Sequence, residues 1–202
     1  MFLTISLLLS VLSRVWLVEK EHKKKFQILA RTDSLTNIYN RYGFDGLAEK
    51  MISKNPQTHF VAALLDIDDF KFINDIYGHS YGDRALKSLA DSMKAFFPSD
   101  ALLGRNGGDE FGILLPNCTF KEVTEQMQQF TKLPKTFSYM GKSQQIYISL
   151  GYAEYPTFAS SYSQLMRCAD AALYEIKLHG KNGCMAYREG LQSGVRKQLG
   201  FA

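Results

Sequence analysis

The sequence predicts an α+β protein, in which helices pack on one or both faces of a mixed sheet, with a further helix at the N-terminus. A continuous apolar run from Phe60 to Leu65 stops abruptly at Asp66, which is typical of a buried central strand. Asn106-Gly107 stands between two short apolar runs, and this pair favours a tight hairpin because such turns need residues with positive φ. Stretches with helical spacing alternate with these runs, and a hairpin among alternating elements is typical of an α+β sheet.

The individual elements follow in chain order from residue 33. Asp33 is a good N-cap, and we expect it to begin a helix that runs to Ile52. The buried strand comes next, and the residues from Asp83 to Phe97 have the amphipathic spacing of a helix. The remaining expected elements are hairpin strands over 101–103 and 111–115, a helix over 121–133, a strand over 145–153, a helix over 163–179 and a last strand over 184–187.

The composition is that of a globular protein, and its charge is confined to one region. The 202 residues carry 24 basic and 20 acidic side chains, a net charge of +4. Residues 14–31 contain the whole excess, so the rest of the chain is neutral. A neutral body offers no basic surface large enough to follow a phosphate backbone, which excludes a nucleic-acid partner. Three cysteines are too few for a disulfide-stapled secreted scaffold.

The N-terminal residues have the pattern of a membrane anchor. Residues 1–18 are mostly apolar, and a helix of that length reaches about 27 Å, close to the ~30 Å hydrocarbon core of a bilayer. Lysines at positions 20 and 23–25 follow directly, which by the positive-inside tendency places the C-terminal side in the cytoplasm. A cleaved signal peptide is disfavoured because no positive charge precedes the run and no small-residue cleavage site follows it.

These observations divide the chain into four parts. We expect an anchor over 1–18 in the inner (cytoplasmic) membrane, a helical linker over 19–32, a globular domain over 33–188 in the cytoplasm and a tail of little pattern over 189–202. The alternatives for the first part are a buried N-terminal helix or the last span of a longer protein.

Two groups of carboxylates are expected to meet at one edge of the sheet. Asp66 ends the buried strand, while Asp109 and Glu110 lie at the tip of the hairpin. Clustered carboxylates repel one another unless a cation neutralises them, and Mg²⁺ prefers one or two carboxylates together with phosphate oxygens. Gly108 leaves room for a phosphate at backbone N–H groups, and Lys71 adds positive charge. The alternative interpretation is an ordinary turn and a solvated strand end, which either motif alone would favour.

The hairpin residues also carry a resemblance to a known family. Arg105 precedes Gly107-Gly108-Asp109-Glu110-Phe111, and with this signature the sequence resembles the GGDEF domain of diguanylate cyclases over about residues 32–187. The other matching motifs are Asp33-Ser34-Leu35-Thr36 with Asn40-Arg41, Asp66-Ile67-Asp68-Asp69-Phe70-Lys71, Ile73-Asn74-Asp75, Tyr77-Gly78-His79, Gly82-Asp83, Ser149-Leu150-Gly151 and Ala169-Asp170-Ala171-Ala172-Leu173-Tyr174 with Lys177.

The resemblance implies a fold and a reaction. The fold is a ferredoxin-like, palm-type sheet of antiparallel and mixed pairing, flanked by helices as in nucleotidyl cyclases. The reaction condenses two GTP molecules into cyclic di-GMP and two pyrophosphates, with one GTP held by each subunit of a homodimer and the two sites facing each other.

The resemblance also assigns the chemistry to particular residues. The side chains of Asp66 and Asp109 and the carbonyl of Ile67 would bind Mg²⁺, with Mn²⁺ as a substitute, and Glu110 is an additional candidate. Asp109 would also accept the proton of the attacking 3′-hydroxyl, and Lys71 would stabilise charge on the transferring phosphoryl group.

The substrate-binding residues are assigned in the same way. Asn74 and Asp83 would hydrogen-bond guanine, with His79 nearby, because a carboxylate accepts from the N1–H and amino group that adenine does not offer together. Lys177 and Lys181 would hold the terminal phosphates.

Three departures from the family pattern bear on these expectations. Lys181 stands where Arg is common, so a bidentate phosphate contact becomes a point charge. Asn37 replaces a usual Gly, and Asn tolerates left-handed φ. Residues 98–101 lack the Arg-x-x-Asp of an inhibitory product site, so feedback inhibition through that site is not expected. The alternatives to a GTP cyclase are a non-catalytic module that binds GTP or a cyclic dinucleotide, and a cyclase that uses ATP.

Overall fold

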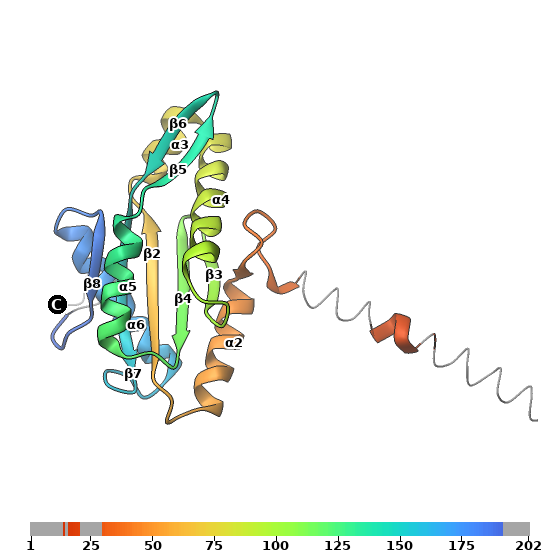
Figure 1. Ribbon diagram of the computed structural model, residues 1–202, viewed down its shortest axis with the longest axis vertical. Coiled ribbons are helices and arrows are strands. Elements are labelled where there is room, and N and C mark those ends of the chain that lie inside the picture. Colours follow the sequence, from red (N-terminus) through yellow and green to blue (C-terminus); the bar gives the residue numbers. More distant parts are fainter. Residues whose placement is uncertain (1–13, 15, 21–29, 192–202) are drawn as a thin grey trace, which may run out of the picture.

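The computed structural model describes residues 14, 16–20 and 30–191, and the globular part is a mixed sheet with helices on both faces (Figure 1). The strands are β1 (Tyr39–Asn40), β2 (Phe60–Ile67), β3 (Leu102–Gly107), β4 (Glu110–Pro116), β5 (Lys135–Tyr139), β6 (Lys142–Ile146), β7 (Ile148–Tyr155) and β8 (Gly183–Ala186), and the helices are α2 (Arg41–Lys54), α3 (Phe70–Tyr77), α4 (His79–Phe96), α5 (Phe120–Lys132) and α6 (Tyr162–Leu178). The main sheet has the order β1-β3-β4-β2-β7-β8, and β5 and β6 form a separate two-stranded sheet. The predicted α+β fold is confirmed.

Strand β2 occupies the middle of the main sheet. It pairs antiparallel with β4 on one side and with β7 on the other, and all of its residues except Leu64 are buried. Burial on both faces explains why its sequence is a continuous apolar run rather than an alternating one. At its end, Asp66 pairs with Glu110 of β4 and with Ser149 of β7. A polar strand end therefore lies inside the sheet, between two neighbours.

Two hydrophobic cores cover the two faces of the sheet. On one face, α4 and α5 pack against the sheet through fully buried side chains that include Leu89, Met93 and Phe130. On the other face, α2 and α6 bury Phe44 and Leu165 among others. The sheet edge that carries Asp66 therefore lies between helices anchored in two separate cores.

Helix α6 lies unusually close to strand β7. A Cβ atom added to Gly151 would stand 2.0 Å from the backbone nitrogen of Leu173, so only glycine fits at this crossing. The close approach fixes the height of α6 above the sheet.

The predicted start of the first helix was wrong. Asp33 does not cap a helix, because its Oδ1 accepts from the backbone N–H of Thr36 at 2.9 Å and from the Thr36 hydroxyl at 2.6 Å within a turn. Helix α2 begins at Arg41, and its N-cap is Asn40, whose side chain accepts from the backbone N–H of Gly43. In the turn, Asn37 has φ 57°, as its tolerance of the left-handed region allows.

The predicted hairpin is confirmed, with strands β3 and β4 on either side of the turn. Gly107 and Gly108 have φ of 139° and 53°, and the pairing register shifts between Arg105 and Gly107. A side chain at either glycine would be strained, so the glycine pair is required by the backbone of the turn.

Four elements, β1, α3, β5 and β6, were absent from the sequence prediction. Residues 70–77 form a separate helix, α3, which ends at Gly78 with φ 81° before α4 begins. The predicted strand over 145–153 combines the end of β6 with β7, and β5 pairs with β6 around a turn at Met140 and Gly141. This small hairpin projects beyond the main sheet next to α3 and α4, at the top of Figure 1.

The predicted anchor over 1–18 and linker over 19–32 lie mostly outside the described residues, as does the tail beyond residue 191. In the described ranges, none of the helices combines the length and the apolar character that a membrane span needs.

Candidate active site

Asp66 is the centre of the candidate site. It lies at the end of β2 with only 8% of its surface exposed, directly across from Glu110 in the register of β2 and β4. Burial raises the pKa of Asp66 to about 6, and the negative charges of Asp109 and Glu110 act in the same direction, while Lys177 opposes them. The expected meeting of the two carboxylate groups at one sheet edge is therefore present in the structure.

The hairpin that carries Asp109 is held in place by one arginine. Arg105 donates from Nε and Nη2 to the carbonyl of Gly108 at 3.0 and 2.7 Å. Its Nη1 also donates to both carboxylate oxygens of Asp33, each at 3.2 Å. Because hydrogen bonds to a guanidinium are charge-assisted, these contacts fix the turn relative to the segment that precedes α2.

Two lysines from α6 and the turn after it reach the end of β2. The Lys177 Nζ lies 2.7 Å from Oδ2 of Asp66, and the Lys181 Nζ donates to Oδ1 of Asp69 at 2.6 Å. The hydrogen bond to Asp69 raises the pKa of Lys181. Both lysines assigned to phosphates thus lie beside the carboxylate cluster, although more than 100 residues separate them from Asp66 in the sequence.

Asp68 joins three segments behind this cluster. Its side chain is 8% exposed and accepts from the Ser149 hydroxyl at 2.6 Å and from the backbone N–H of Asn182 at 2.9 Å. Its own backbone N–H donates to the carbonyl of Tyr147 at 3.0 Å. Sequence reasoning assigned Asp68 no role, although its place two residues after Asp66 puts both on one side of the strand end.

The residues assigned to guanine lie on α3 and α4. The Oδ1 atom of Asn74 is buried and has no hydrogen-bond partner in the described part of the chain. A Cβ atom on Gly82 would stand 2.1 Å from that oxygen, so glycine makes room for the Asn74 side chain. Asp83 and His79 are exposed on the first two turns of α4. A buried polar atom without a partner beside exposed polar groups is typical of a ligand-binding position.

Lys71 lies apart from these pairs. It is exposed on the first turn of α3, four residues beyond the carbonyl of Ile67. The structure therefore leaves its side chain open to solvent.

The donor set at the end of β2 fits a hard divalent cation. The carboxylates of Asp66 and Asp109 and the carbonyl of Ile67 are oxygen ligands, which Mg²⁺ prefers. No cluster of three or more His, Cys, Asp or Glu side chains arranged to hold a metal occurs among the residues that the structure describes. Two carboxylates are nevertheless enough for Mg²⁺, which takes much of its coordination from water and substrate phosphates.

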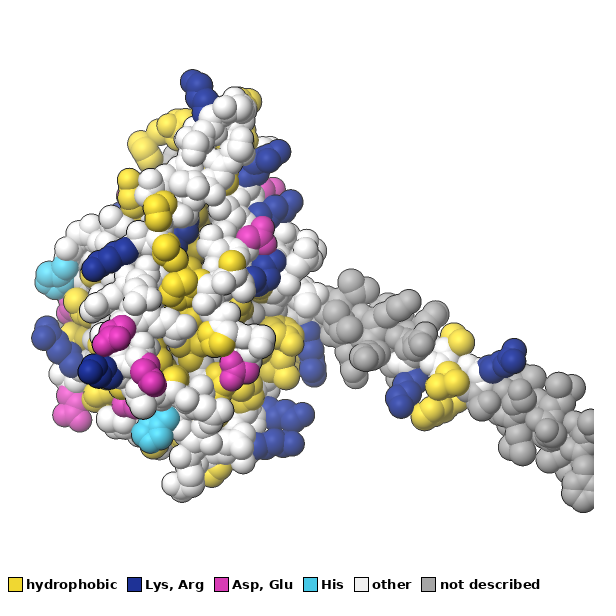
Figure 2. Space-filling model, viewed as in Figure 1, with side chains coloured by type: hydrophobic (Ala, Val, Ile, Leu, Met, Phe, Trp, Pro, Cys, Tyr) yellow, Lys and Arg dark blue, Asp and Glu magenta, His cyan; other side chains and the backbone are white. Residues whose placement is uncertain are grey.

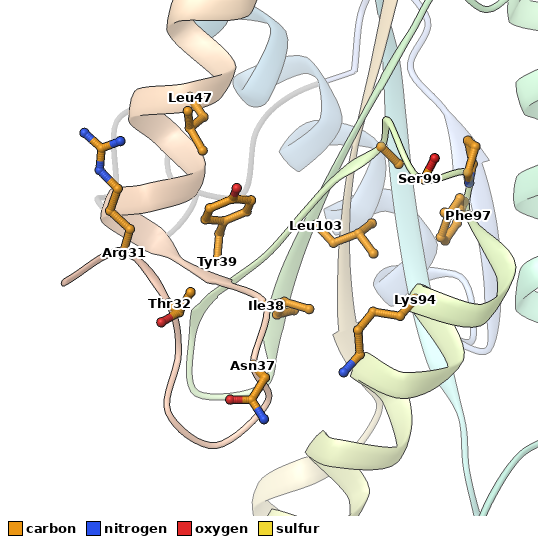
Figure 3. Close-up of a pocket in the computed structure, with 12 residues that line it drawn as sticks. Arg31, Thr32, Asn37, Ile38, Tyr39, Leu47, Lys94, Phe97, Ser99 and Leu103 are labelled. Carbon is orange, nitrogen blue, oxygen red and sulfur yellow. The ribbon is translucent and has the colours of Figure 1, made fainter. Parts of the chain in front are cut away.

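A spacious cavity lies elsewhere. It encloses about 780 Å³ between the 31–39 segment, α2, α4 and β3 (Figure 3). Pro98 and Ala101 line it, at the two positions where an arginine and an aspartate would be needed for the inhibitory motif that the sequence lacks. None of the predicted catalytic, metal or substrate residues lines this cavity.

A smaller cavity borders the candidate site. It encloses about 380 Å³, and Asn106 and Glu110 of the hairpin line it together with Asp170 of α6. Burial raises the pKa of Asp170, and Lys177, which pairs with Asp66, opposes that effect.

Comparison with known proteins identifies the family. Residues 30–183 match the family model described as "Diguanylate cyclase, GGDEF domain". The chain belongs to the GGDEF family. It is 30% identical over 165 residues to the probable diguanylate cyclase DgcC of Escherichia coli K12, a match that covers 80% of this chain and 44% of DgcC. It is also 32% identical over 183 residues to the cyclic di-GMP phosphodiesterase PdeR of the same organism, which covers 90% of this chain and 28% of PdeR.

Solved structures of GGDEF domains have the same fold. The coiled coil and GGDEF domain of DgcB from Caulobacter crescentus, in complex with c-di-GMP, aligns with a TM-score of 0.78 at 28% identity and covers 90% of this chain and 99% of that one. The palm-type fold implied by the sequence is therefore confirmed. The chain spans less than half the length of DgcC and of PdeR.

Proposed function

We propose that this protein is a diguanylate cyclase, which condenses two GTP molecules into cyclic di-GMP and releases two pyrophosphates at a homodimer interface. The observation that carries the proposal is the convergence of Asp66, Asp109 and Lys177 at one sheet edge of a GGDEF domain. Acidic oxygens for a cation and an ammonium for phosphate are the parts that nucleotidyl transfer needs.

Asp66, Asp109 and the carbonyl of Ile67 would hold the cation, Mg²⁺ or Mn²⁺. When bound, the cation would neutralise negative charge on the phosphates and act as a Lewis acid. Asp109 accepts the proton of the 3′-hydroxyl as that oxygen attacks the α-phosphorus of the GTP held by the partner subunit. A new 3′-O–P bond forms, and the bond from the α-phosphorus to the bridging oxygen breaks, so that pyrophosphate leaves.

The remaining residues bind and orient the nucleotide. Lys71, which is exposed on α3, stabilises charge on the transferring phosphoryl group, and Lys177 and Lys181 hold the terminal phosphates. Asn74 and Asp83 hydrogen-bond guanine, with His79 beside them. Gly108 lets a phosphate approach the backbone of the hairpin turn.

The same reaction requires two copies of the chain. One GTP supplies only one of the two GMP units of the product, so two sites must face each other. We further propose that residues 1–18 anchor the protein in the inner membrane with the domain in the cytoplasm, because the whole positive excess of the chain lies in residues 14–31.

Product analysis tests the proposal. The full chain is incubated with GTP and Mg²⁺, and the products are separated by chromatography beside those of Asp109→Ala. We expect cyclic di-GMP and pyrophosphate in a 1:2 ratio from the wild type and at least a 100-fold lower rate from the variant. No product from a dimeric wild type, or equal rates from both proteins, would contradict the assignment.

A second candidate is a non-catalytic nucleotide-binding module. The similarity to PdeR favours it, since that relative is named a phosphodiesterase although it shares this domain. Measurable GTP affinity without turnover in the dimer would establish this alternative. Competition between labelled GTP and ATP separates the guanine assignment from an ATP cyclase, which would incorporate both nucleotides equally.

A further inference from the structure

We propose that Lys177 occupies the cation position of Asp66 in the resting protein and moves to the triphosphate when a divalent cation binds. Cation binding and nucleotide binding would then be coupled through one side chain. The inference rests on the proposed function, because it takes Asp66 as a cation ligand and Lys177 as a phosphate ligand.

The contact between the two side chains carries the inference. The Lys177 Nζ lies 2.7 Å from Oδ2 of Asp66, which is the distance of a charge-assisted hydrogen bond. Asp66 is almost fully buried, while about a third of the Lys177 side chain is exposed, so the lysine has the freedom to leave and the carboxylate does not.

A divalent cation and an ammonium group cannot share this carboxylate without strong repulsion. Two positive groups within a few ångströms repel more strongly in a partly buried site than in water, because the effective dielectric constant there is lower. A cation that enters must therefore displace Lys177. The displaced ammonium gains a new partner only when the triphosphate is present, which makes the cation bind more tightly with nucleotide than without it.

The chain offers a matched control in its second lysine pair. Lys181 contacts Asp69 at 2.6 Å, a similar distance, but Asp69 is exposed and is not among the assigned cation ligands. Removal of either lysine should weaken GTP binding. Only removal of Lys177 should strengthen cation binding, because only Lys177 blocks a cation ligand.

The experiment measures Mn²⁺ binding to the full chain without nucleotide, from the free Mn²⁺ signal in electron paramagnetic resonance. We expect Lys177→Gln to bind Mn²⁺ about tenfold more tightly than the wild type, Lys181→Gln to stay within about threefold of it, and Asp66→Asn to lose binding. Thermal unfolding of each variant checks that it is folded.

The outcomes separate this inference from the proposed function. If Lys177→Gln binds Mn²⁺ no more tightly than the wild type while Asp66→Asn loses binding, the displacement of Lys177 by the cation is contradicted, and Asp66 is kept as a cation ligand. If Asp66→Asn binds Mn²⁺ as well as the wild type, both the displacement of Lys177 and the assignment of Asp66 as a cation ligand are contradicted.

A different set of contacts carries a second inference, that Asp68 is a positioning residue for Lys181. Asp68 accepts from Ser149 and from the backbone N–H of Asn182, the residue next to Lys181. Lys181 and Asn182 both have left-handed φ, 63° and 49°, and this conformation is uncommon for a residue such as lysine. The carboxylate of Asp68 is the buried group that ties this turn to β7.

A double-mutant cycle with GTP binding as readout tests this role. We expect Asp68→Asn to weaken equilibrium GTP binding about tenfold in the wild-type background and by less than about twofold in the Lys181→Ala background, because coupled residues are non-additive. Equal effects in the two backgrounds would show that Asp68 is merely structural. Ser149→Ala, which removes one contact and keeps the carboxylate, provides a second variant if Asp68→Asn does not fold, and the same non-additivity is expected of it.

Discussion

Helices α3 and α6 both carry residues that we propose to bind the substrate, at the same end of the sheet, but the two helices are anchored to the fold in opposite ways. Helix α3 has eight residues, none of them buried, whereas α6 has 17 residues, of which six are buried. The apolar side chains Phe72, Ile76 and Tyr77 of α3 are more than half exposed, and hydrophobic side chains are visible at that end of the molecule in Figure 2.

The difference separates the proposed base-binding residues from the proposed phosphate-binding residues. Lys177 lies on a helix with many buried side chains, so its position is fixed by the core. Asn74 lies on a helix bounded by Asp69 and Gly78, which both have positive φ, and the N-terminus of that helix has no side-chain cap. Elements with few buried contacts open at low free-energy cost, so we expect α3 to be more dynamic than α6.

The largest effect is expected at Asp66, which contacts Lys177 of α6. Asp66→Asn should lower cyclase activity at least 1,000-fold, because it removes a charged cation ligand. The same change should stabilise the protein in the absence of cation and nucleotide. The folded pKa is about 6 against 3.8 for the free side chain, so this group stabilises the fold below about pH 4 and that contribution is lost as the pH rises through 6.

The stabilisation by Asp66→Asn should be on the order of 2 to 3 kcal/mol at pH 8. Urea unfolding of the cation-free protein at pH 4 and pH 8 measures it, and the gain should be small at pH 4. A variant that is less stable than the wild type at pH 8 would contradict the sign.

The next effect concerns the contact of α6 with β7. Gly151→Ala places a Cβ atom 2.0 Å from the backbone of Leu173, which cannot move without shifting α6. We expect the free energy of unfolding to fall by about 3 kcal/mol or more. Denaturant titration gives the value, and a loss below about 1 kcal/mol would mean that α6 adjusts freely and is not held by the core.

Gly82, which lies beside Asn74, should behave differently from Gly151. Gly82→Ala meets the side-chain oxygen of Asn74 at 2.1 Å, and that side chain can rotate. We expect GTP binding to weaken about tenfold while the free energy of unfolding changes by less than about 1 kcal/mol, since alanine favours a helix interior. Equilibrium GTP binding and urea unfolding are compared on one preparation, and a large loss of stability would show that α3 is part of the core after all.

The smallest effect is expected at the exposed face of α3. Phe72 is 64% exposed, so Phe72→Ser should change the free energy of unfolding by less than about 0.5 kcal/mol. Amide hydrogen exchange should be faster in α3 than in α6 for both the wild type and the variant. Equal protection of the two helices would remove the distinction between them.

The sequence predicted those elements whose signal is local. The hairpin followed from Asn106-Gly107, whose backbone requirement is independent of the rest of the fold, and β2 followed from an apolar run that only a buried strand explains. The prediction that a helix begins at Asp33 was wrong, because the hydrogen bonds that make an aspartate a good N-cap also stabilise the turn in which Asp33 lies.

Elements that depend on distant contacts could not be predicted in this way. Strand β6 is polar and largely exposed, so its sequence lacks the alternation that a half-buried strand shows, and the alternation of β5 extends over only five residues. The pairs of Lys177 with Asp66 and of Asp68 with Asn182 join residues more than 100 positions apart. The family resemblance named Lys177 and Asp66 as site residues, but only the structure shows that they contact each other.

The exposed helix α3 has a consequence for how this protein can diverge. Because the helix that carries Asn74 has no fully buried side chain and packs against the core through partly buried Phe70, substitutions along the rest of it carry little penalty in folding. Lineages that descend from such a chain can therefore drift in the base they prefer while the scaffold is preserved. Changes around Lys177 have no such freedom, since each is screened for folding as well as for chemistry.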